Sequence, residues 1–82
     1  MGINEAASLL AACKPLCEKL VASGANCEQS FNYELEKEDL TQLWGFYKVT
    51  KAGFGYNDQV RRAAGLERSD LNLLNFVLAC QI

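Results

Sequence analysis

The 82-residue sequence contains no histidine, a single proline and no long apolar run. Histidine is the commonest general base and the commonest metal ligand near neutral pH, so its absence removes Ser–His–Asp and Cys–His catalytic arrangements. No glycine-rich loop leads into the Lys and Ser or Thr of a phosphate-binding site. No stretch reaches the roughly 18–20 apolar residues that a membrane span needs. We therefore expect a protein outside the membrane, with no enzymatic activity, no catalytic residues and no cofactor.

The residues that are present are typical of a small globular domain. Half of them are hydrophobic and 22% are charged, which excludes disorder as a description of the whole chain. A chain of this length forms one domain, whose core buries only about 60–65% of the unfolded surface. We expect residues 1–82 to fold as one unit.

The charges are distributed unevenly, although the net charge is only −2. Residues 28–39 carry five acidic side chains against one lysine, whereas residues 40–68 carry five basic side chains against two acidic ones. The acidic total disfavours a nucleic-acid ligand. The basic segment 40–68 nevertheless offers a surface for a phosphate backbone or an acidic partner, with an ordinary solvated helix face as the alternative.

The sequence contains four cysteines: Cys13, Cys17, Cys27 and Cys80. No secretion signal is recognisable, so we expect a cytoplasmic protein with reduced thiols. The first two lie four residues apart on one expected helix, where parallel Cβ directions disfavour a disulfide between them. Buried thiols are the favoured interpretation, and no metal ligand is assigned. Two disulfides, or a four-thiolate zinc site that lacks the usual Cys-x-x-Cys spacing, are the alternatives.

Apolar residues recur at spacings of three and four over residues 4–23, which predicts a helix. Pro15 disturbs this helix, because proline lacks a backbone N–H and clashes with the preceding turn. The segment is therefore either kinked near residues 11–12 or split, with Pro15 in the first turn of a second helix. Gly24 is expected to end it in a left-handed conformation.

Residues 25–38 predict an extended loop whose aromatic side chains dock on the helices. The next helix is expected to begin at Asp39, with Gln42 completing a capping box. Its buried stripe is expected to contain Leu40, Leu43, Trp44 and Tyr47. The alternative is a small hairpin between residues 31–35 and 46–51, which would make the fold α+β.

The C-terminal half predicts a turn and two more helices. Residues 53–56 form the turn, Asn57 or Asp58 caps a short helix that Gly65 ends, and Ser69 caps the last helix. The predicted fold is all-α, a small bundle of four or five short helices.

Residues 57–78 resemble a helix-turn-helix corner, in which two helices join through a tight turn that contains glycine. If Gly65 is that glycine, the five positions that hold such a pair together are all apolar: Val60, Ala64, Leu66, Leu71 and Leu74. The position four residues before the glycine is usually alanine and here is Arg61. The resemblance implies a helical corner at residues 57–78 and leaves its function open.

Two functions from different classes follow from these patterns. The first is a small non-enzymatic binding protein that regulates or inhibits a larger macromolecular partner through protein–protein contacts. Its surplus of aromatic residues supports this function, with Phe54 and Tyr56 as the expected contacts. The second is a helix-turn-helix DNA-binding regulator, which would act as a homodimer. Its phosphate contacts would be Lys48, Lys51, Arg61, Arg62 and Arg68.

Overall fold

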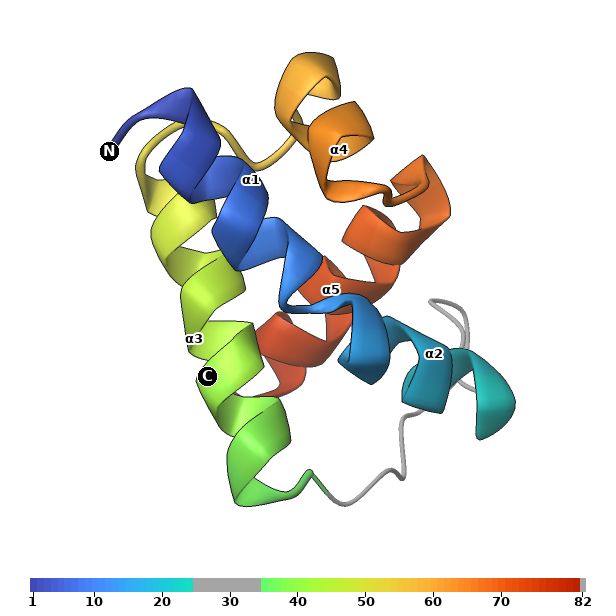
Figure 1. Cartoon of the computed structure of the whole chain (residues 1–82). Helices are drawn as coiled ribbons and strands as arrows, with labels where there is room; N and C mark the ends of the chain where they lie inside the picture. The colour runs from blue at the N-terminus through green and yellow to red at the C-terminus, as the bar shows by residue number, and fades with distance from the viewer. Residues whose placement is uncertain (25–34, 82) are drawn as a thin grey trace.

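Pro15 splits the N-terminal helical segment into two short helices. The computed structural model describes residues 1–24 and 35–81, and Figure 1 shows their arrangement. Helix α1 spans Ile3–Ala11 and α2 spans Lys14–Ala22, with Pro15 in the first turn of α2. Proline fits there because the backbone N–H groups of a first turn have no partner within the helix. Gly24 follows α2 with a φ of +79°, which confirms the predicted left-handed end.

Helix α3 spans Lys37–Lys51 and begins two residues earlier than predicted. The prediction that Asp39 precedes the helix as its cap was wrong: the cap is Glu36, three residues earlier, and the Asp39 carboxylate caps from inside the first turn. The backbone N–H of Glu36 donates to Asp39 Oδ2 at 3.1 Å. An acidic side chain at the third helical position satisfies an N–H group that the helix itself leaves unpaired.

The two C-terminal helices are α4, Asp58–Ala64, and α5, Arg68–Gln81. The side chain of Asn57 accepts a hydrogen bond from the N–H of Val60 at 3.1 Å. Gly65 ends α4 with a φ of +75°, a conformation that glycine adopts without steric cost. Both features confirm the predictions. The cap of α5 is not Ser69, which lies inside the helix; instead, the N–H of Glu67 donates to Asp70 Oδ2 at 2.9 Å.

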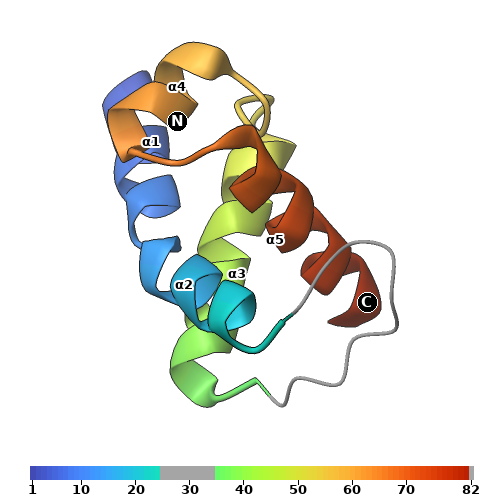
Figure 2. The ribbon, with the colours of Figure 1, turned by 90° about the vertical axis from the view of Figure 1, so that its right-hand side faces the viewer.

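The five helices of residues 1–24 and 35–81 form an all-α fold around one core. Figures 1 and 2 show α4 beside α1, at the end of the molecule where α1 begins and α3 finishes. Helix α1 packs against α3 and, most extensively, against α4, while α5 packs against α2 and α3. The α+β alternative is wrong for residues 46–51, which belong to α3. Its other half, residues 31–35, lies outside the described residues except for Leu35.

The core takes side chains from every helix. α3 contributes Leu43, Phe46 and Val49, all buried. The expectation that Trp44 belongs to the buried stripe was wrong: its side chain is 55% exposed. Trp44 and Phe46 are only two residues apart, so at about 100° per residue they point to nearly opposite sides of the helix. The interior takes Phe46, and Trp44 is therefore left on the outer face.

The predicted corner at residues 57–78 is present. All five of its apolar positions are buried, namely Val60, Ala64, Leu66, Leu71 and Leu74. Helix α4 nevertheless makes its largest contact with α1, so α1 contributes more to fixing the corner than the α4–α5 contact does.

The thiols that the structure describes are free. Cys13 and Cys17 are buried, as favoured by the sequence, and the Sγ of Cys13 lies 3.2 Å from the carbonyl oxygen of Gln42 on α3. Burial raises the pKa of Cys13 to about 11 and that of Cys17 to about 12. Cys80 is exposed, and Cys27 lies outside the described residues.

Candidate functional site: the outer face of α3

The two aromatic residues predicted to contact a partner occupy different environments. Phe54 is half-buried and packs against the core, and its N–H donates to the carbonyl oxygen of Val49 at 3.0 Å. Tyr56 is exposed, and its hydroxyl meets α5, where it donates to Asn72 at 3.3 Å and accepts from Asn75. Phe54 therefore serves the fold, whereas Tyr56 lies at the surface over α5.

Two of the three predicted arginines converge on one carboxylate, that of Asp58. Arg68 donates to both of its oxygens, at 3.1 and 3.3 Å, and Arg61 Nε lies 3.6 Å from Oδ1. The hydrogen bond and charge of Arg68, followed by the charges of Arg61 and Arg62, hold the pKa of Asp58 below its usual value. Arg61 also donates to the carbonyl oxygen of Leu66 at 2.9 Å. Its side chain braces the α4–α5 turn and is not free to contact a phosphate.

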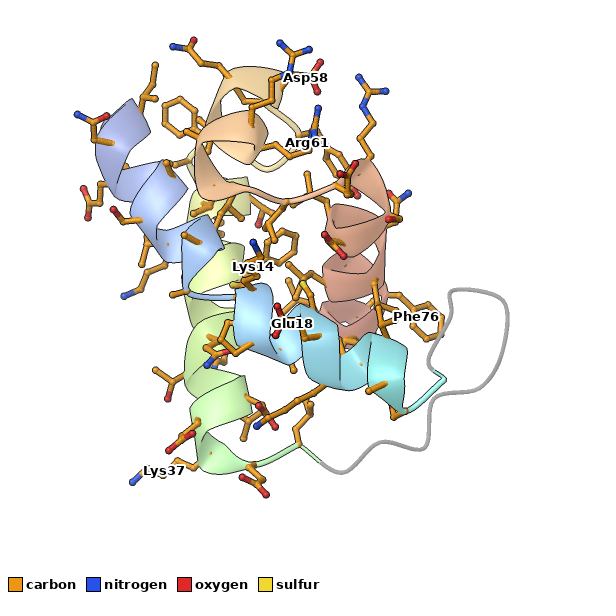
Figure 3. The ribbon with its side chains drawn as sticks, turned by 45° about the vertical axis from the view of Figure 1, so that its right-hand side comes forward. Lys14, Glu18, Lys37, Asp58, Arg61 and Phe76 are labelled. Atoms are coloured by element: carbon orange, nitrogen blue, oxygen red, sulfur yellow. The ribbon has the colours of Figure 1, made fainter. Side chains whose placement is uncertain are left out.

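The remaining predicted cations lie on the exposed surfaces of α3 and α4. Arg62 is exposed on α4, and Lys48 and Lys51 are exposed on α3. Figure 3 shows Asp58 and Arg61 together at one end of the molecule, while Lys37, at the start of α3, lies at the opposite end. Of the seven predicted contact residues, Phe54 thus packs against the core, Arg61 and Arg68 share Asp58, and Lys48 and Lys51 are exposed on α3.

The outer face of α3 gathers the residues most suited to binding a partner. We call this the α3 surface and define it as Lys37, Leu40, Trp44, Tyr47, Lys48 and Lys51. Spacings of three, four and seven place all six on one side of a helix. The opposite side of α3 is buried in the core through Asp39, Leu43, Phe46 and Val49, so the orientation of the α3 surface is fixed by the fold.

The aromatic side chains of the α3 surface touch one another. The rings of Trp44 and Tyr47 meet edge to face, with centroids 5.4 Å apart and planes at 90°. The ammonium group of Lys51 lies 5.6 Å from the centroid of the Tyr47 ring, a distance at which the charge and the ring attract each other. Tyr47 therefore contacts both Trp44 and Lys51. Because these contacts already restrict the side chains, less conformational entropy is lost when a partner covers them.

An ion pair between a buried carboxylate and a half-exposed lysine holds α3 in place. The carboxylate of Asp39 is 1% exposed and lies 3.2 Å from Lys19 Nζ on α2. It also accepts the N–H of Glu36 at 3.1 Å. Because a buried carboxylate is costly without partners, these contacts define how α2 meets the first turn of α3. Asp39 therefore supports the α3 surface from beneath and is not part of that surface.

Two hollows lie elsewhere on the described part of the chain. One, of about 320 Å³, is lined by Lys14, Cys17, Glu18, Val21, Ala22 and Asp70; the other, of about 300 Å³, is lined by Tyr56, Asp58, Arg68, Leu71 and Asn72. Burial and the charge of Asp70 raise the pKa of Cys17 to about 12, so its thiol is a poor nucleophile at neutral pH. The only carboxylate lining the second hollow is that of Asp58, which Arg68 holds ionised.

Within residues 1–24 and 35–81, no group of three potential ligand side chains lies close enough to hold a metal ion. None of the helices described is long and apolar enough to cross a bilayer. Comparison with known proteins finds no matching family model, no similar curated protein and no similar solved structure. The α3 surface therefore has to be interpreted from its own chemistry.

Sequence reasoning missed Trp44 as a surface residue because its position fits an apolar stripe. A signal was nevertheless present. Trp44 lies seven residues from both Lys37 and Lys51 and four from Lys48, and two helical turns return to the same face. A tryptophan that shares a helical face with three lysines is on a solvated face, because unpaired lysines are almost never buried.

Proposed function

We propose that this chain is a small non-enzymatic binding protein that regulates or inhibits a larger protein partner, and that it contacts this partner through the α3 surface. The observation that carries the proposal is the position of Trp44, 55% exposed on the outer side of a helix whose inner side is anchored in the core. Large aromatic side chains held rigidly at a surface are typical of the residues that dominate binding energy at protein interfaces.

The energetics of Trp44 support this proposal. Burying an aromatic side chain of this size removes enough apolar surface from water to supply about 2–3 kcal/mol. Left in solvent, that surface contributes nothing to stability, so the fold gains little from a tryptophan at this position. Tyr47, over which Lys51 lies, already meets the Trp44 ring edge to face before a partner arrives, which lowers the entropic cost of binding.

The proposal is tested by capture with matched variants. The immobilised wild-type domain, Trp44→Ala and Val21→Ala are each used to capture proteins, and the protein retained by the wild type is purified and titrated against all three. Val21 is the control because it is 63% exposed on α2, outside the α3 surface. We expect Trp44→Ala to weaken binding by about 30-fold, corresponding to about 2 kcal/mol, and Val21→Ala to leave it unchanged. Equal binding by all three proteins would reject the α3 surface.

A second candidate function, DNA binding by the corner at residues 57–78, is supported by the burial of its five apolar positions. The charges on the surface of this corner are less suitable for binding DNA. Arg61 and Arg68 are both engaged with Asp58, and two acids, Glu67 and Asp70, lie at the N-terminal end of α5, where they would face phosphates.

The DNA candidate is tested by anisotropy of a random-sequence duplex at rising salt. Binding that falls steeply with salt and is weakened by Arg62→Glu would support a phosphate-facing corner. Arg62 is the proper probe because its side chain is exposed on α4, whereas a substitution of Arg61 would also remove its bond to the turn. An absence of binding at low salt would reject this function and leave the corner as scaffold.

As part of the same proposal we infer a cytoplasmic location, where the thiols of Cys13, Cys17 and Cys80, unpaired in the structure, would stay reduced. Free thiols persist where the surroundings are reducing. Fractionation of cells that express the tagged chain, with thiol labelling before and after reduction, tests this location.

A further inference from the structure

We propose that the partner segment that covers the α3 surface is acidic, an amphipathic peptide segment that combines apolar side chains with Asp or Glu. This inference rests on the proposed function and names the chemistry of its partner. It commits to a peptide and excludes two other occupants of the same surface, a second copy of this chain and a single-stranded nucleic acid.

The charges on α3 carry the proposal. Residues 40–51 contain two lysines and no acid, and Lys37 lies on the same face two turns before Trp44. Glu36 lies before the helix as its cap, and the two acids that follow Lys37 point away from Trp44. Glu38 is about 120° around the helix from Trp44 at 100° per residue, and Asp39 is buried against Lys19. The tryptophan is therefore framed by three cations in a chain whose net charge is −2.

Helix stability accounts for only part of this pattern. Lys48 and Lys51 lie in the last turn of α3, where cations interact favourably with the helix dipole. Lys37 occupies the first helical position, where a cation meets the positive end of that dipole and is unfavourable. A lysine that the helix does not favour, on the same face as Trp44, is explained by an anionic group that binds there.

A second copy of the chain is a poor occupant. Trp44 is the central residue of α3, so a twofold axis through it would place Lys37 of one copy against Lys51 of the other. If the two α3 helices ran parallel instead, each lysine would lie against the same lysine of the other copy. Like charges brought together in an interface cost free energy, whereas Asp or Glu side chains at the same points would pair with all three lysines.

A single-stranded nucleic acid is also disfavoured. Single-stranded nucleic acids stack successive bases on several open aromatic faces, and the α3 surface offers only Trp44, because one face of Tyr47 is taken by Lys51. An apolar side chain between acidic residues fits the exposed Trp44 ring without displacing Lys51. Charge and ring geometry together favour an acidic peptide.

The test is a selection from a library of short random peptides, displayed and enriched on the wild-type domain. A parallel enrichment on Trp44→Ala identifies the sequences that depend on the α3 surface. We expect the Trp44-dependent sequences to be enriched in Asp and Glu relative to the starting library.

One of the selected peptides is then synthesised and titrated against variants of the domain. It should bind Lys48→Glu/Lys51→Glu about tenfold more weakly than wild type, because two exposed charge pairs are lost. The control is Arg62→Glu on α4, which reverses an exposed charge outside the α3 surface. The lysines of α2 are avoided as controls because Lys19 pairs with Asp39.

The outcomes are separable. Trp44-dependent peptides of neutral or basic composition would overturn the acidic partner while leaving the α3 surface intact as a binding surface. Displacement of the selected peptide by oligo(dT), or a dimer in sedimentation that Trp44→Ala dissociates, would overturn it in favour of a nucleic acid or a second copy. A lack of any Trp44-dependent enrichment, together with equal capture by Trp44→Ala, would reject the proposed function itself.

Discussion

Replacing Asp39 with alanine removes the contact that fixes the start of α3 against α2. The carboxylate accepts the N–H of Glu36 at 3.1 Å and lies 3.2 Å from Lys19 Nζ. Loss of the capping hydrogen bond costs about 1 kcal/mol. Loss of the ion pair adds about 1–2 kcal/mol, less than for a fully buried pair because Lys19 is 42% exposed and partly screened by water. The expected total of about 2–3 kcal/mol is a large share of the roughly 4–12 kcal/mol typical of a domain this size.

Two further variants divide this cost into its parts. Asp39→Asn keeps an oxygen that can accept the N–H of Glu36 but removes the charge opposite Lys19, so we expect a loss of about 1–2 kcal/mol. Glu38→Ala changes an exposed neighbouring acid and should alter the free energy of unfolding by less than about 0.5 kcal/mol. Urea unfolding followed by far-UV circular dichroism measures all three. An Asp39→Ala protein as stable as Glu38→Ala would refute the reasoning.

Three further predictions concern backbone geometry and buried thiols. Gly65→Ala should lower the free energy of unfolding by about 1 kcal/mol in urea, because the φ of +75° is strained for alanine; an unchanged value would show that the turn relaxes. Gly45→Ala should raise it by about 0.5–1 kcal/mol, because a Cβ there meets Leu9 at an ordinary 3.6 Å and alanine favours the helix; destabilisation would mean that α1 and α3 tolerate no added methyl group. Stability should fall as the pH rises above about 9, because Cys13 and Cys17 ionise in the unfolded chain near 9 but only near about 11 and 12 when folded; unfolding across this pH range, compared with the double alanine variant, checks that the thiols cause the fall, and equal slopes would contradict it.

The sequence was most informative where local chemistry decides the structure. Pro15 marked the boundary between two helices, Asn57 and Gly65 defined both ends of α4, and the apolar positions around Gly65 identified the corner. Each of these features depends on a few neighbouring residues, whose backbone preferences are strong enough to survive any tertiary arrangement.

The errors arose where tertiary packing decides. Trp44 fits the apolar spacing of α3, but the helix can bury only one side, and that side is set by Phe46 and Val49. Asp39 was expected to lie before the helix, yet Lys19, twenty residues earlier in the chain, makes a buried position inside it favourable. The hydrogen bond from Arg61 to the carbonyl oxygen of Leu66 could not be predicted from composition, because it follows from the geometry of the corner.

The most direct test of the central claim uses the fact that Trp44 is the only tryptophan in the chain. Labelling the domain with fluorotryptophan gives one fluorine NMR signal, which is followed while the captured partner, or a selected acidic peptide, is added. The account predicts that this signal shifts to a new position at saturation and loses its sensitivity to a soluble paramagnetic quencher, because the partner covers the ring. A saturated complex in which the signal keeps its position and its exposure would contradict the assignment of binding to the α3 surface.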